Sequence, residues 1–554
     1  MKASDLFVRC LEEEGVERIF GVPGEENADT MISLLDSKID FILCRHEQAA
    51  AFMADVYGRL TGKAGVCLAT LGPGATNLVT GIADANMDRA PLVGIIGQAG
   101  TYRLHKESHQ NMDSIAMFRP ITKWAQTVSN AGAIPEIVRK AFKVAEQEKP
   151  GAVLIELPED LAKNDVPEAA AKPMKPVRTR RPGADHKAIK EAVDVILAAK
   201  NPMILAGNGA IRKRAAAQLA IMAEKLGIGV INTFMGKGAV PRSSEYCLFT
   251  MGLQGKDHAN VAIDACDTII SVGYDLVEYS PSHWNKTKGK KIVHIDFWPA
   301  EVDTDYDATV DVQGDIADAL WQVNKELDDR GVSKPPFDIA KVQPLRQRIL
   351  DDFAMEKDSD AFPMKPQKVL WDVREVMGEE DILLSDVGAH KMWISRYYQC
   401  DTPNTCLISN GFCTMGFAMP GSIGAKFARP NSRVLAINGD AGFMMNVQDI
   451  ETAARLKLNV VWMVWCDSEY GLIKWKQQNQ FGGKHSELKF TNPDFAMMAK
   501  SFGIWGRNLT SAAELKPALE EAFQQDGPAL IALPIDYAEN VKMTKRLGEI
   551  DAVI

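Results

Sequence analysis

Two aspartates, Asp440 and Asp467, each follow directly after a strongly apolar run. These runs are "RVLAING" and "NVVWMVWC", and a stretch with helical spacing, "NVQDIETAARLK", lies between them. Val447, Ile450 and Ala454 fall on one face of that predicted helix. A strand–helix–strand unit makes its two strands parallel, so both aspartates should emerge at the same carboxyl edge of one sheet. That edge is where α/β proteins bind ligands.

The chemistry that suits this pair is the binding of a cation together with a phosphate. Two carboxylates supply hard oxygen donors of the kind that magnesium prefers. Gly439 and Gly442 flank Asp440 and allow the backbone to approach a ligand closely, and the helix N-terminus that follows favours an anion. The pair therefore predicts a magnesium ion that clamps a phosphate or a diphosphate. The alternative is that both aspartates only cap helices, because aspartate is a favoured N-cap.

The stretch "GDAGF…CDSEYG" resembles the thiamine diphosphate motif of 2-oxo-acid carboligases and decarboxylases. The resemblance implies that the side chains of Asp440 and Asp467 and the main-chain carbonyl of Glu469 hold magnesium. Ala441 stands where that family has a third-position glycine, and Cys466 where it has an asparagine, but neither change removes a ligand. The cofactor-binding residues implied in this stretch are Gly439, Asp440, Ala441, Gly442, Asp467, Glu469, Tyr470 and Gly471.

Glu47 lies at the start of a second stretch, "LCRHEQAAAFMADVYGRLTGKAG", whose apolar positions from Ala49 to Leu60 have helical spacing. An acidic residue in a first turn commonly does no more than stabilise the helix dipole. The pattern "RHEQ.AAFMA.GR.TGK.GV", however, resembles the signature of the acetolactate synthase (acetohydroxyacid synthase) family. In that family this glutamate binds the cofactor and activates its pyrimidine ring by favouring the imino tautomer. The resemblance thus makes Glu47 both a catalytic and a cofactor-binding residue.

Three further segments match the same family. "ISNGFCTMGFAMPGSIGAK" (408–426) places Met415 where a bulky residue bends the cofactor, and the Cys413 carbonyl would accept a bond from its amine. Taken alone, Met415 would be an ordinary core residue. "SDVGAHKMW" (385–393) resembles the loop on the diphosphate and implies that Gly388, Ala389 and His390 bind there. "ESHQNMD" (107–113) makes Gln110 a candidate to orient the substrate or to donate to an oxyanion.

The elements that must position these residues alternate between strand-like and helical patterns, which predicts parallel sheets covered on both faces. We therefore expect an α/β protein with three doubly wound parallel-sheet domains. Proline-rich and polar stretches between the alternating blocks read as linkers. The expected ranges are a pyrimidine-binding domain (1–165), a linker (166–184), a central domain (185–330), a second linker (331–365) and a diphosphate- and magnesium-binding domain with a C-terminal tail (366–554).

Bulk properties exclude several classes of protein. The 554 residues are enough for about three domains. The 63 Lys and Arg residues against 73 Asp and Glu argue against a nucleic-acid or anionic membrane partner, and no apolar run spans a bilayer. The N-terminus lacks the order of a secretion signal, and the nine cysteines contain no C-x-x-C pair, so we expect a cytoplasmic protein.

The resemblance covers essentially the whole chain and implies a reaction. Glu47 promotes the imino tautomer, the resulting ylide attacks pyruvate, carbon dioxide leaves, and the enamine attacks a second pyruvate to give 2-acetolactate. Because Glu47 and Asp440 lie in different domains, the active sites should form between the chains of a homodimer or homotetramer. "GLIKWKQQNQF" has Trp475 one place before the position of the biosynthetic enzymes' tryptophan and Lys476 at it, which favours pyruvate over 2-oxobutanoate as acceptor.

The middle of the chain leaves the subtype open. "SVGYDLVEYSPSHWN" (271–285) is similar to the flavin-free catabolic acetolactate synthases, which need no regulatory subunit. "FMGKGAVP" (234–241) and "TMGLQGKDHAN" (250–260) are similar to the flavin-binding members, so a non-redox FAD is neither required nor excluded, and the pathway is either branched-chain amino acid or acetoin biosynthesis. The rival functions are a flavin-linked pyruvate oxidase, a simple 2-oxo-acid decarboxylase and a non-catalytic diphosphate-binding module.

Overall fold

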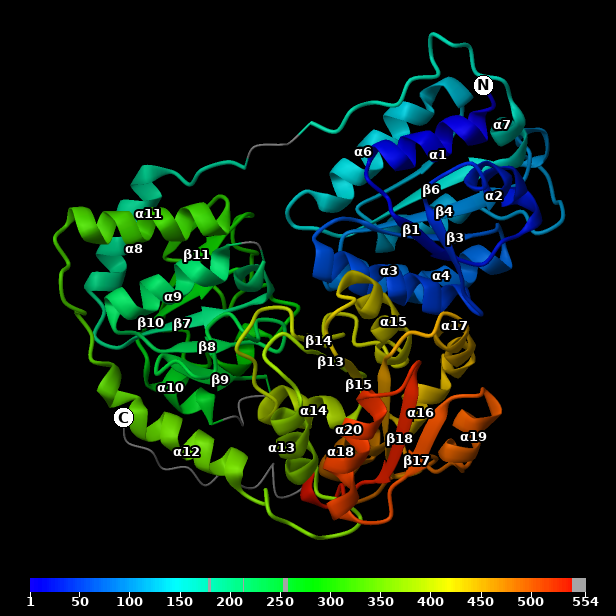
Figure 1. Cartoon of the computed structure of the whole chain (residues 1–554). Helices are drawn as coiled ribbons and strands as arrows, with labels where there is room; N and C mark the ends of the chain where they lie inside the picture. The colour runs from blue at the N-terminus through cyan, green and yellow to red at the C-terminus, as the bar shows by residue number, and fades with distance from the viewer. Residues whose placement is uncertain (178–180, 213, 253–257, 541–554) are drawn as a thin grey trace.

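The computed structural model describes residues 1–177, 181–212, 214–252 and 258–540. Parts of the expected first linker (178–180), of the segment 250–260 (253–257) and of the expected C-terminal tail (541–554) lie outside these residues. The chain forms three parallel six-stranded sheets, each with helices on its faces (Figure 1). The predicted fold class, α/β with three doubly wound parallel sheets, is confirmed.

The first sheet has the strand order β2-β1-β3-β4-β6-β5, and all its neighbouring strands are parallel. Its strands are β1 (Arg18–Gly21), β2 (Asp40–Leu43), β3 (Gly65–Ala69), β4 (Leu92–Gln98), β5 (Trp124–Thr127) and β6 (Ala152–Pro158). Its helices are α1 (Ala3–Glu13), α2 (Ala28–Leu34), α3 (Glu47–Thr61), α4 (Pro73–Met87), α5 (Ser114–Phe118), α6 (Ile134–Glu146) and α7 (Glu159–Lys163). The central strands are buried on both faces, as their continuous apolar runs predict.

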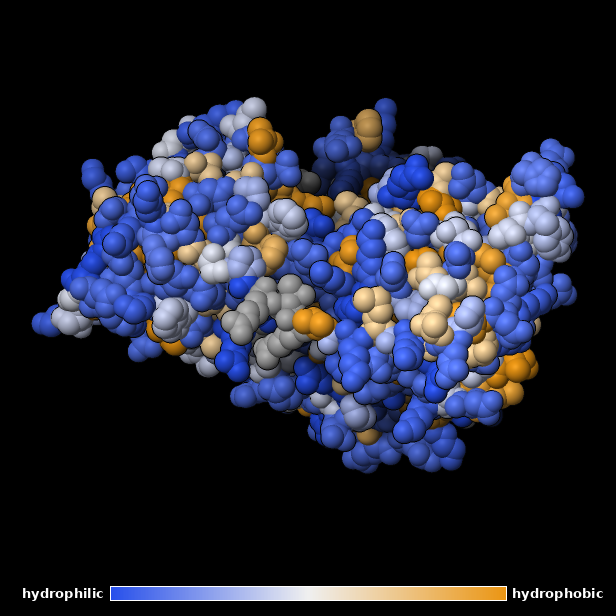
Figure 2. Space-filling view, turned by 90° about the horizontal axis from the view of Figure 1, so that it is seen from above, coloured by the Kyte–Doolittle hydropathy of each residue, from blue (hydrophilic) through white to orange (hydrophobic). Residues whose placement is uncertain are grey.

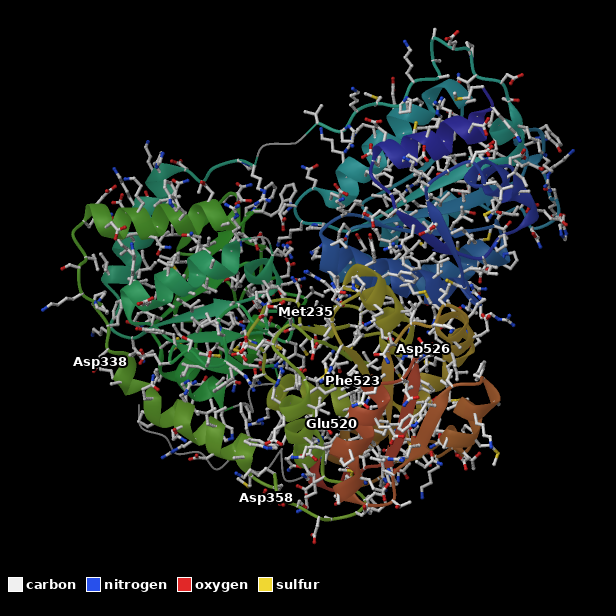
Figure 3. All side chains as sticks on the ribbon, viewed as in Figure 1. Met235, Asp338, Asp358, Glu520, Phe523 and Asp526 are labelled. Carbon is white, nitrogen blue, oxygen red and sulfur yellow. The ribbon has the colours of Figure 1, made fainter. Side chains whose placement is uncertain are left out.

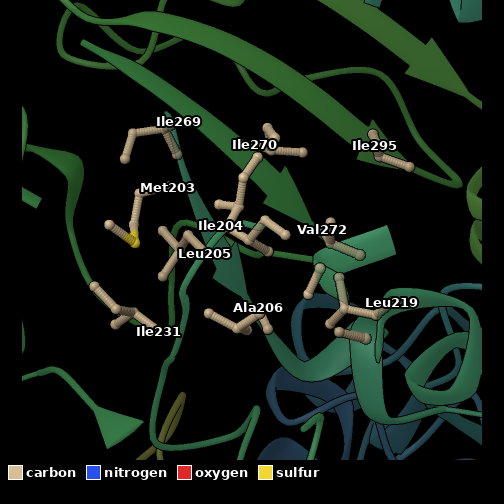
Figure 4. Packing of buried hydrophobic residues seen from close by; sticks show 14 of the residues in the cluster. Met203, Ile204, Leu205, Ala206, Leu219, Ile231, Ile269, Ile270, Val272 and Ile295 are labelled. Carbon is tan, nitrogen blue, oxygen red and sulfur yellow. The ribbon is translucent and has the colours of Figure 1, made fainter. Parts of the chain in front are cut away.

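The second sheet has the order β12-β11-β10-β7-β8-β9. Its strands are β7 (Pro202–Ala206), β8 (Val230–Asn232), β9 (Cys247–Thr250), β10 (Thr268–Val272), β11 (Lys291–Asp296) and β12 (Val310–Gln313). Its helices are α8 (His186–Leu197), α9 (Ala215–Leu226), α10 (Ala259–Ala265) and α11 (Ile316–Asp329), and α12 (Gln343–Ala354) follows. Aliphatic side chains of β7 and β10, among them Ile204 and Ile270, form the centre of its core (Figure 4).

The third sheet has the order β14-β13-β15-β16-β18-β17. Its strands are β13 (Ile382–Ser385), β14 (Cys406–Ile408), β15 (Val434–Gly439), β16 (Val461–Cys466), β17 (Trp505–Asn508) and β18 (Ala529–Pro534). Its helices are α13 (Pro366–Val376), α14 (Ala389–Tyr397), α15 (Ala418–Ala428), α16 (Asp440–Met444), α17 (Ile450–Arg455), α18 (Gly471–Gln480), α19 (Phe495–Ser501) and α20 (Leu515–Phe523). β15 and β16 are adjacent and parallel, as the two apolar runs predict.

One predicted helix differs from the structure. The stretch 446–457 was expected to be continuous, but a 3-10 turn occupies Val447–Asp449 and α17 begins only at Ile450. The cause lies in tertiary hydrogen bonds at the break. The Asn446 side chain donates to the Gly416 carbonyl oxygen (2.8 Å), and the Asp449 carboxylate accepts from the backbone N–H of Arg45 (2.9 Å). These bonds hold the turn between two other segments of the chain.

The first and third domains pack against each other through α3 and α15, and one hydrophobic cluster runs through both of them (Figure 1). The helices approach closely because glycine lines the contact. A Cβ atom on Gly424 would collide with the carbonyl oxygen of Met53, and one on Gly421 would lie 2.9 Å from a methyl group of Val56. The helix that begins at Glu47 is therefore fixed against the domain that carries Asp440.

The surface is mainly hydrophilic on the face seen from above, with scattered hydrophobic side chains between the charged ones (Figure 2). Within the described part of the chain, no helix is both long and apolar enough to cross a membrane.

Candidate active site

Asp440 and Asp467 lie next to each other at the carboxyl ends of β15 and β16. One oxygen of the Asp440 carboxylate, Oδ2, accepts hydrogen bonds from the backbone N–H groups of Asp467 (3.1 Å) and Ser468 (2.8 Å). The N-caps of the helices that follow are Gly439 and Tyr470, so neither aspartate has the helix-capping role that was the alternative. The structure thus brings the two predicted acids together.

The electrostatics of the pair favour a cation. Asp440 is 1% exposed, and within the described residues neither carboxylate forms an ion pair. Burial and the charge of Asp440 raise the pKa of Asp467 to about 7. Two carboxylates this close repel each other, and a divalent cation between them would remove the repulsion.

The third oxygen that the resemblance implies is also nearby. The main-chain carbonyl of Glu469 accepts one hydrogen bond, from the N–H of Gly471 (2.9 Å), while the Glu469 side chain pairs with Lys474. Among the residues described, no three His, Cys, Asp or Glu side chains are grouped to hold a metal. Two carboxylates and one carbonyl are a donor set that fits magnesium, which keeps waters as its other ligands.

His390 lies beside this pair with an unsatisfied nitrogen. Its side chain is 2% exposed, and its Nε2 has no hydrogen-bond partner among the described residues. Burial lowers the pKa of His390 to about 3, so the imidazole is neutral. Gly439 permits this arrangement, because a Cβ atom there would lie 3.1 Å from the His390 ring. Gly388 and Ala389 start helix α14 at the same place, so their backbone joins His390 in a cradle that suits an anion.

A buried carboxylate, Asp386, fixes the segment that carries Met415. Its oxygens accept hydrogen bonds from the backbone N–H groups of Gly416 (3.2 Å) and Phe417 (3.1 Å). A Cβ on Gly442 would collide with the same carboxylate, and burial raises the pKa of Asp386 to about 7. The Met415 segment and the loop after β15 are therefore held at a fixed separation.

Met415 itself is half-buried, and Cys413 is exposed. Cys413 has a φ of 62°, a left-handed conformation that turns the backbone between the two residues. The ammonium of Lys391 donates to the Cys413 sulfur (3.1 Å). This contact ties the exposed turn to helix α14, which also carries His390.

Glu47 is the first residue of α3 and lies with a second set of residues. The side-chain amide of Asn77 donates to its Oε2 (2.9 Å), and a Cβ on Gly74 would lie 3.4 Å from its Oε1. The exposed Gln110 has a φ of 57°, and its carbonyl oxygen would lie 2.7 Å from a Cβ on Gly72. The structure thus brings Glu47 and Gln110 to the two ends of one glycine-rich loop.

The two sets of residues are not bonded directly to each other within the described part of one chain. None of the hydrogen bonds or ion pairs found among the described residues joins Glu47 or Gln110 to Asp440, Asp467 or Met415. The side-chain partner of Glu47, Asn77, belongs to its own domain.

The central domain has a third place where a ligand could bind. Its strand order reverses between β7 and β10, and a nucleotide normally sits in the crevice at such a switch point. Here the two loops touch, because the N–H of Gly209 donates to the Gly273 carbonyl (2.7 Å). The buried carboxylate of Glu278 accepts from the N–H groups of Asn208 (3.0 Å) and Asp275 (2.9 Å). The carboxyl group of Glu278 therefore occupies the amides that would bind a phosphate.

The space beside that crevice is a cavity of about 650 Å³ lined by Arg89, Lys149 and Asp275, among others. Both cations pair with Asp275, and Lys149 also pairs with Asp296. Tyr274, which also lines this cavity, is buried against Trp284. Among the described residues, every lysine and arginine that lines this cavity has partners. Arg89 and Lys149 pair with acids, and the ammonium of Lys123 donates to three carbonyl oxygens.

Comparison with known proteins agrees with this division into sites. Residues 1–117, 189–323 and 386–533 match the N-terminal thiamine pyrophosphate binding domain, the central domain and the C-terminal thiamine pyrophosphate binding domain of thiamine pyrophosphate enzymes. The chain is 33% identical to the acetolactate synthase of Bacillus subtilis (strain 168), over 99% of this chain and 96% of that protein. It belongs to the acetolactate synthase family.

Two other relatives extend the match. The chain is 35% identical to "Acetolactate synthase, catabolic" of Raoultella terrigena, over 97% of this chain and 95% of that one. It is 34% identical to the "Probable acetolactate synthase large subunit" of Methanocaldococcus jannaschii, over 100% and 95%. Glu47 and Gln110 lie in the N-terminal thiamine pyrophosphate binding domain of this family, and Asp440 and Asp467 in the C-terminal one. The cofactor of the two outer domains is thus thiamine diphosphate.

The sequence of this family member did not reveal three site residues that the structure adds. Asn77 holds Glu47, and Asn492 donates to Asp440 Oδ2 (2.7 Å) from a loop far along the chain, where no local pattern marks it. Asp386 does carry a signal, because it follows the buried strand β13 just as Asp440 follows β15. The same reasoning applied to every strand end would have found it.

Glu278→Gln should flatten the pH dependence of stability. Burial raises the pKa of Glu278 to about 7 in the folded protein, against ~4.3 for an exposed glutamate. The stability that the protonated form provides is complete below the unfolded pKa and is lost as the pH rises through the folded one, at ~1.4 kcal/mol per pH unit. We expect the Tm of the wild type to fall more than that of Glu278→Gln between about pH 4.5 and about pH 7.

Differential scanning fluorimetry across this range measures the difference, and the slopes that other buried acids contribute cancel in the comparison. Parallel Tm curves for the two proteins would show that Glu278 is ionised at all these pH values and that the crevice is not closed by a neutral acid.

Proposed function

We propose that this chain is an acetolactate synthase that joins two molecules of pyruvate into 2-acetolactate and carbon dioxide, using thiamine diphosphate and magnesium. The observation that carries the proposal is the pair of adjacent acids, the buried Asp440 and the half-buried Asp467, beside Nε2 of His390, which has no partner among the described residues. A cation and an anion are both needed to satisfy these groups, and a magnesium diphosphate supplies both.

The chain's own residues then have distinct tasks at the diphosphate end. The Asp440 and Asp467 side chains and the Glu469 carbonyl would hold magnesium, and the neutral His390 would donate from Nε2 to the diphosphate. Asn492 fixes the Asp440 carboxylate in place. Backbone groups complete the cradle, at Gly388, Ala389, Gly439, Ala441, Gly442, Tyr470 and Gly471.

At the other end, the residues control the pyrimidine ring and the substrate. Bound thiamine diphosphate supplies the electron sink for decarboxylation. Glu47 would bind a nitrogen of the pyrimidine ring, and the hydrogen bond from Asn77 fixes its carboxyl group. The Met415 side chain and the Cys413 carbonyl set the ring orientation, and the exposed amide of Gln110 orients pyruvate.

The complete site forms between two chains of a homodimer or homotetramer. Glu47 and Asp440 are not joined within one chain, and apolar side chains are exposed around the Asp440 end, at Phe412 (42%), Met445 (43%) and Ile473 (46%). Exposed apolar side chains of this kind mark interaction surfaces. Some relatives are named large subunits, but those of Bacillus subtilis and Raoultella terrigena are not, which supports activity without a regulatory subunit.

Flavin is not part of this proposal. The Glu278 carboxyl group accepts from the amides at the switch point of the central domain, and the loops there touch, which argues against a bound dinucleotide. A pyruvate oxidase needs a redox flavin, and the closed crevice therefore favours the synthase over that rival. The exposed Lys476 stands at the position where the biosynthetic enzymes have a tryptophan, while Trp475, one place before it, packs against the core of the third domain. This arrangement supports pyruvate over 2-oxobutanoate as acceptor.

Purified protein given pyruvate, thiamine diphosphate and magnesium should form 2-acetolactate in a colourless solution. Product analysis by mass spectrometry identifies the product, and a visible absorption spectrum detects flavin. Added FAD should change neither the rate nor the spectrum of the bound fraction. Acetaldehyde as the main product would favour the decarboxylase, and a yellow protein whose turnover depends on oxygen or a quinone would favour the oxidase.

Glu47→Gln should leave cofactor binding largely intact and reduce turnover at least ~100-fold, because it removes an acid–base contribution. Glu136→Gln is the matched control, since Glu136 is exposed in the first turn of α6 and should retain wild-type turnover. Steady-state kinetics and calorimetric titration with thiamine diphosphate provide the two measurements. Wild-type turnover in Glu47→Gln would reduce Glu47 to a helix-stabilising acid and contradict the assignment.

A further inference from the structure

The segment 409–417, which carries Cys413 and Met415, is attached to the first domain as well as to its own. The backbone N–H groups of Asn410 (3.0 Å) and Gly411 (2.5 Å) donate to the Asp88 carboxylate, at the end of α4. The hydroxyl of Ser409 donates to Oδ1 of Asp84, in the same helix (2.5 Å). Two acids of α4 thus hold the first half of this segment.

These acids belong to a buried charge cluster. The Arg59 guanidinium, in the last turn of α3, bonds Asp55 (2.6 Å), Asp88 (2.9 Å) and Asp84 (3.4 Å). The side chains of all four residues are at least nine-tenths buried. One cation faces three acids. Burial, together with the charges of Asp88 and Asp55, therefore raises the pKa of Asp84 well above its usual range. Burying these charged groups costs free energy of desolvation, so packing alone does not explain the cluster.

The cluster surrounds the place where the three domains meet. Arg59 Nη1 donates to the Ile408 carbonyl (3.1 Å), and Arg59 and Asp88 line a cavity of about 410 Å³. Met235 of the central domain, labelled in Figure 3, lines the same cavity. The side chain of Asn410 also donates to the Glu278 carbonyl in the central domain (3.0 Å). The segment before Met415 is consequently bonded to all three domains.

The Ser409 hydroxyl connects Asp84 to the backbone beside Met415 through two hydrogen bonds. It donates to Asp84 and at the same time accepts from the backbone N–H of Thr414 (2.8 Å), the residue just before Met415. On the other side of Met415, the N–H of Gly416 is held by Asp386. The backbone of Met415 is thus clamped on both sides, by one acid from the first domain through a serine and by one from the third domain directly.

We propose that Asp84 and Ser409 are positioning residues, which set the place of the Met415 side chain and the Cys413 carbonyl. This inference rests on the proposed function of those two groups, but it assigns a task to residues that touch neither cofactor nor substrate. A rival explanation is that the bonds only add stability at the domain contact. The two explanations differ in what happens locally when the hydroxyl is removed.

Ser409→Ala removes the connecting hydroxyl, and Ser422→Ala is its matched control. Ser422 is also fully buried in the third domain, where its hydroxyl donates to the Met419 carbonyl (2.6 Å) and accepts from Trp462 (2.9 Å), but it has no bond to 409–417. Both variants lose a buried serine hydroxyl with one donated and one accepted bond. A general loss of stability should therefore be similar in the two and appear as similar decreases in Tm.

Hydrogen–deuterium exchange of the full-length protein without cofactor gives a readout that does not depend on activity. Peptides that cover 409–417 should exchange about 3- to 10-fold faster in Ser409→Ala than in the wild type, the scale of one lost hydrogen bond. The same peptides in Ser422→Ala should match the wild type. Unchanged exchange in Ser409→Ala would show that the hydroxyl does not hold the segment and would overturn the proposal.

Kinetics of the two variants decide whether the held position matters. We expect kcat of Ser409→Ala to fall about 10- to 100-fold, as for a small misplacement of a catalytic group, with KM for pyruvate and the affinity for thiamine diphosphate within about 3-fold of wild type. Ser422→Ala should keep its kcat. Faster exchange with an unchanged kcat would overturn positioning and leave a structural tie. A wild-type protein without thiamine-dependent turnover would instead contradict the proposed function, and the exchange result would still stand.

Discussion

Two carboxylates at the tips of neighbouring parallel strands are the constraint on which the rest of this structure depends. Parallel pairing of β15 and β16 makes Asp440 and Asp467 neighbours, and burial together with the charge of Asp440 raises the pKa of Asp467 to about 7. Neither acid pairs with a cation among the described residues. In the proposed function the pair binds a divalent ion, and the ion carries the anion that would lie against His390 and the start of α14. The chemistry of the third domain follows from that one requirement.

Buried acids accept hydrogen bonds from several of the loops in this structure. Asp386 fixes the loop around Met415, Asp84 and Asp88 tie it to the first domain, and Glu278 closes the crevice of the central domain. In each case a carboxylate accepts bonds from backbone N–H groups or from a hydroxyl, so its burial is compensated by hydrogen bonds. A side chain of this kind fixes irregular backbone that has no regular secondary structure to support it. The loops at the candidate site are thus hydrogen-bonded to acids that lie inside the protein.

Much of this arrangement is predictable from the sequence. Apolar runs identify the parallel strands, and the aspartates that follow two of these runs are predicted to be neighbours, as the structure has them, because strand ends meet at one edge. The sequence does not reveal contacts that join distant segments. Asn492 reaches Asp440 from a separate loop, and Asn446 breaks a helix whose apolar pattern is continuous because its amide bonds Gly416. The sequence also does not predict that Glu278 closes the central crevice, because the hydrogen-bond partners of the Glu278 carboxyl group come from three different loops.

Calorimetric titration of magnesium in the presence of thiamine diphosphate tests the central claim most directly. The account predicts a single magnesium ion per chain in the wild type, and at least ~10-fold weaker binding in Asp440→Asn and in Asp467→Asn. Asp358→Asn, which changes an exposed aspartate away from the site (Figure 3), should bind as the wild type does. Magnesium affinity that is unchanged in either Asp440→Asn or Asp467→Asn would contradict the account, because the two acids would then be neighbours without a shared ion.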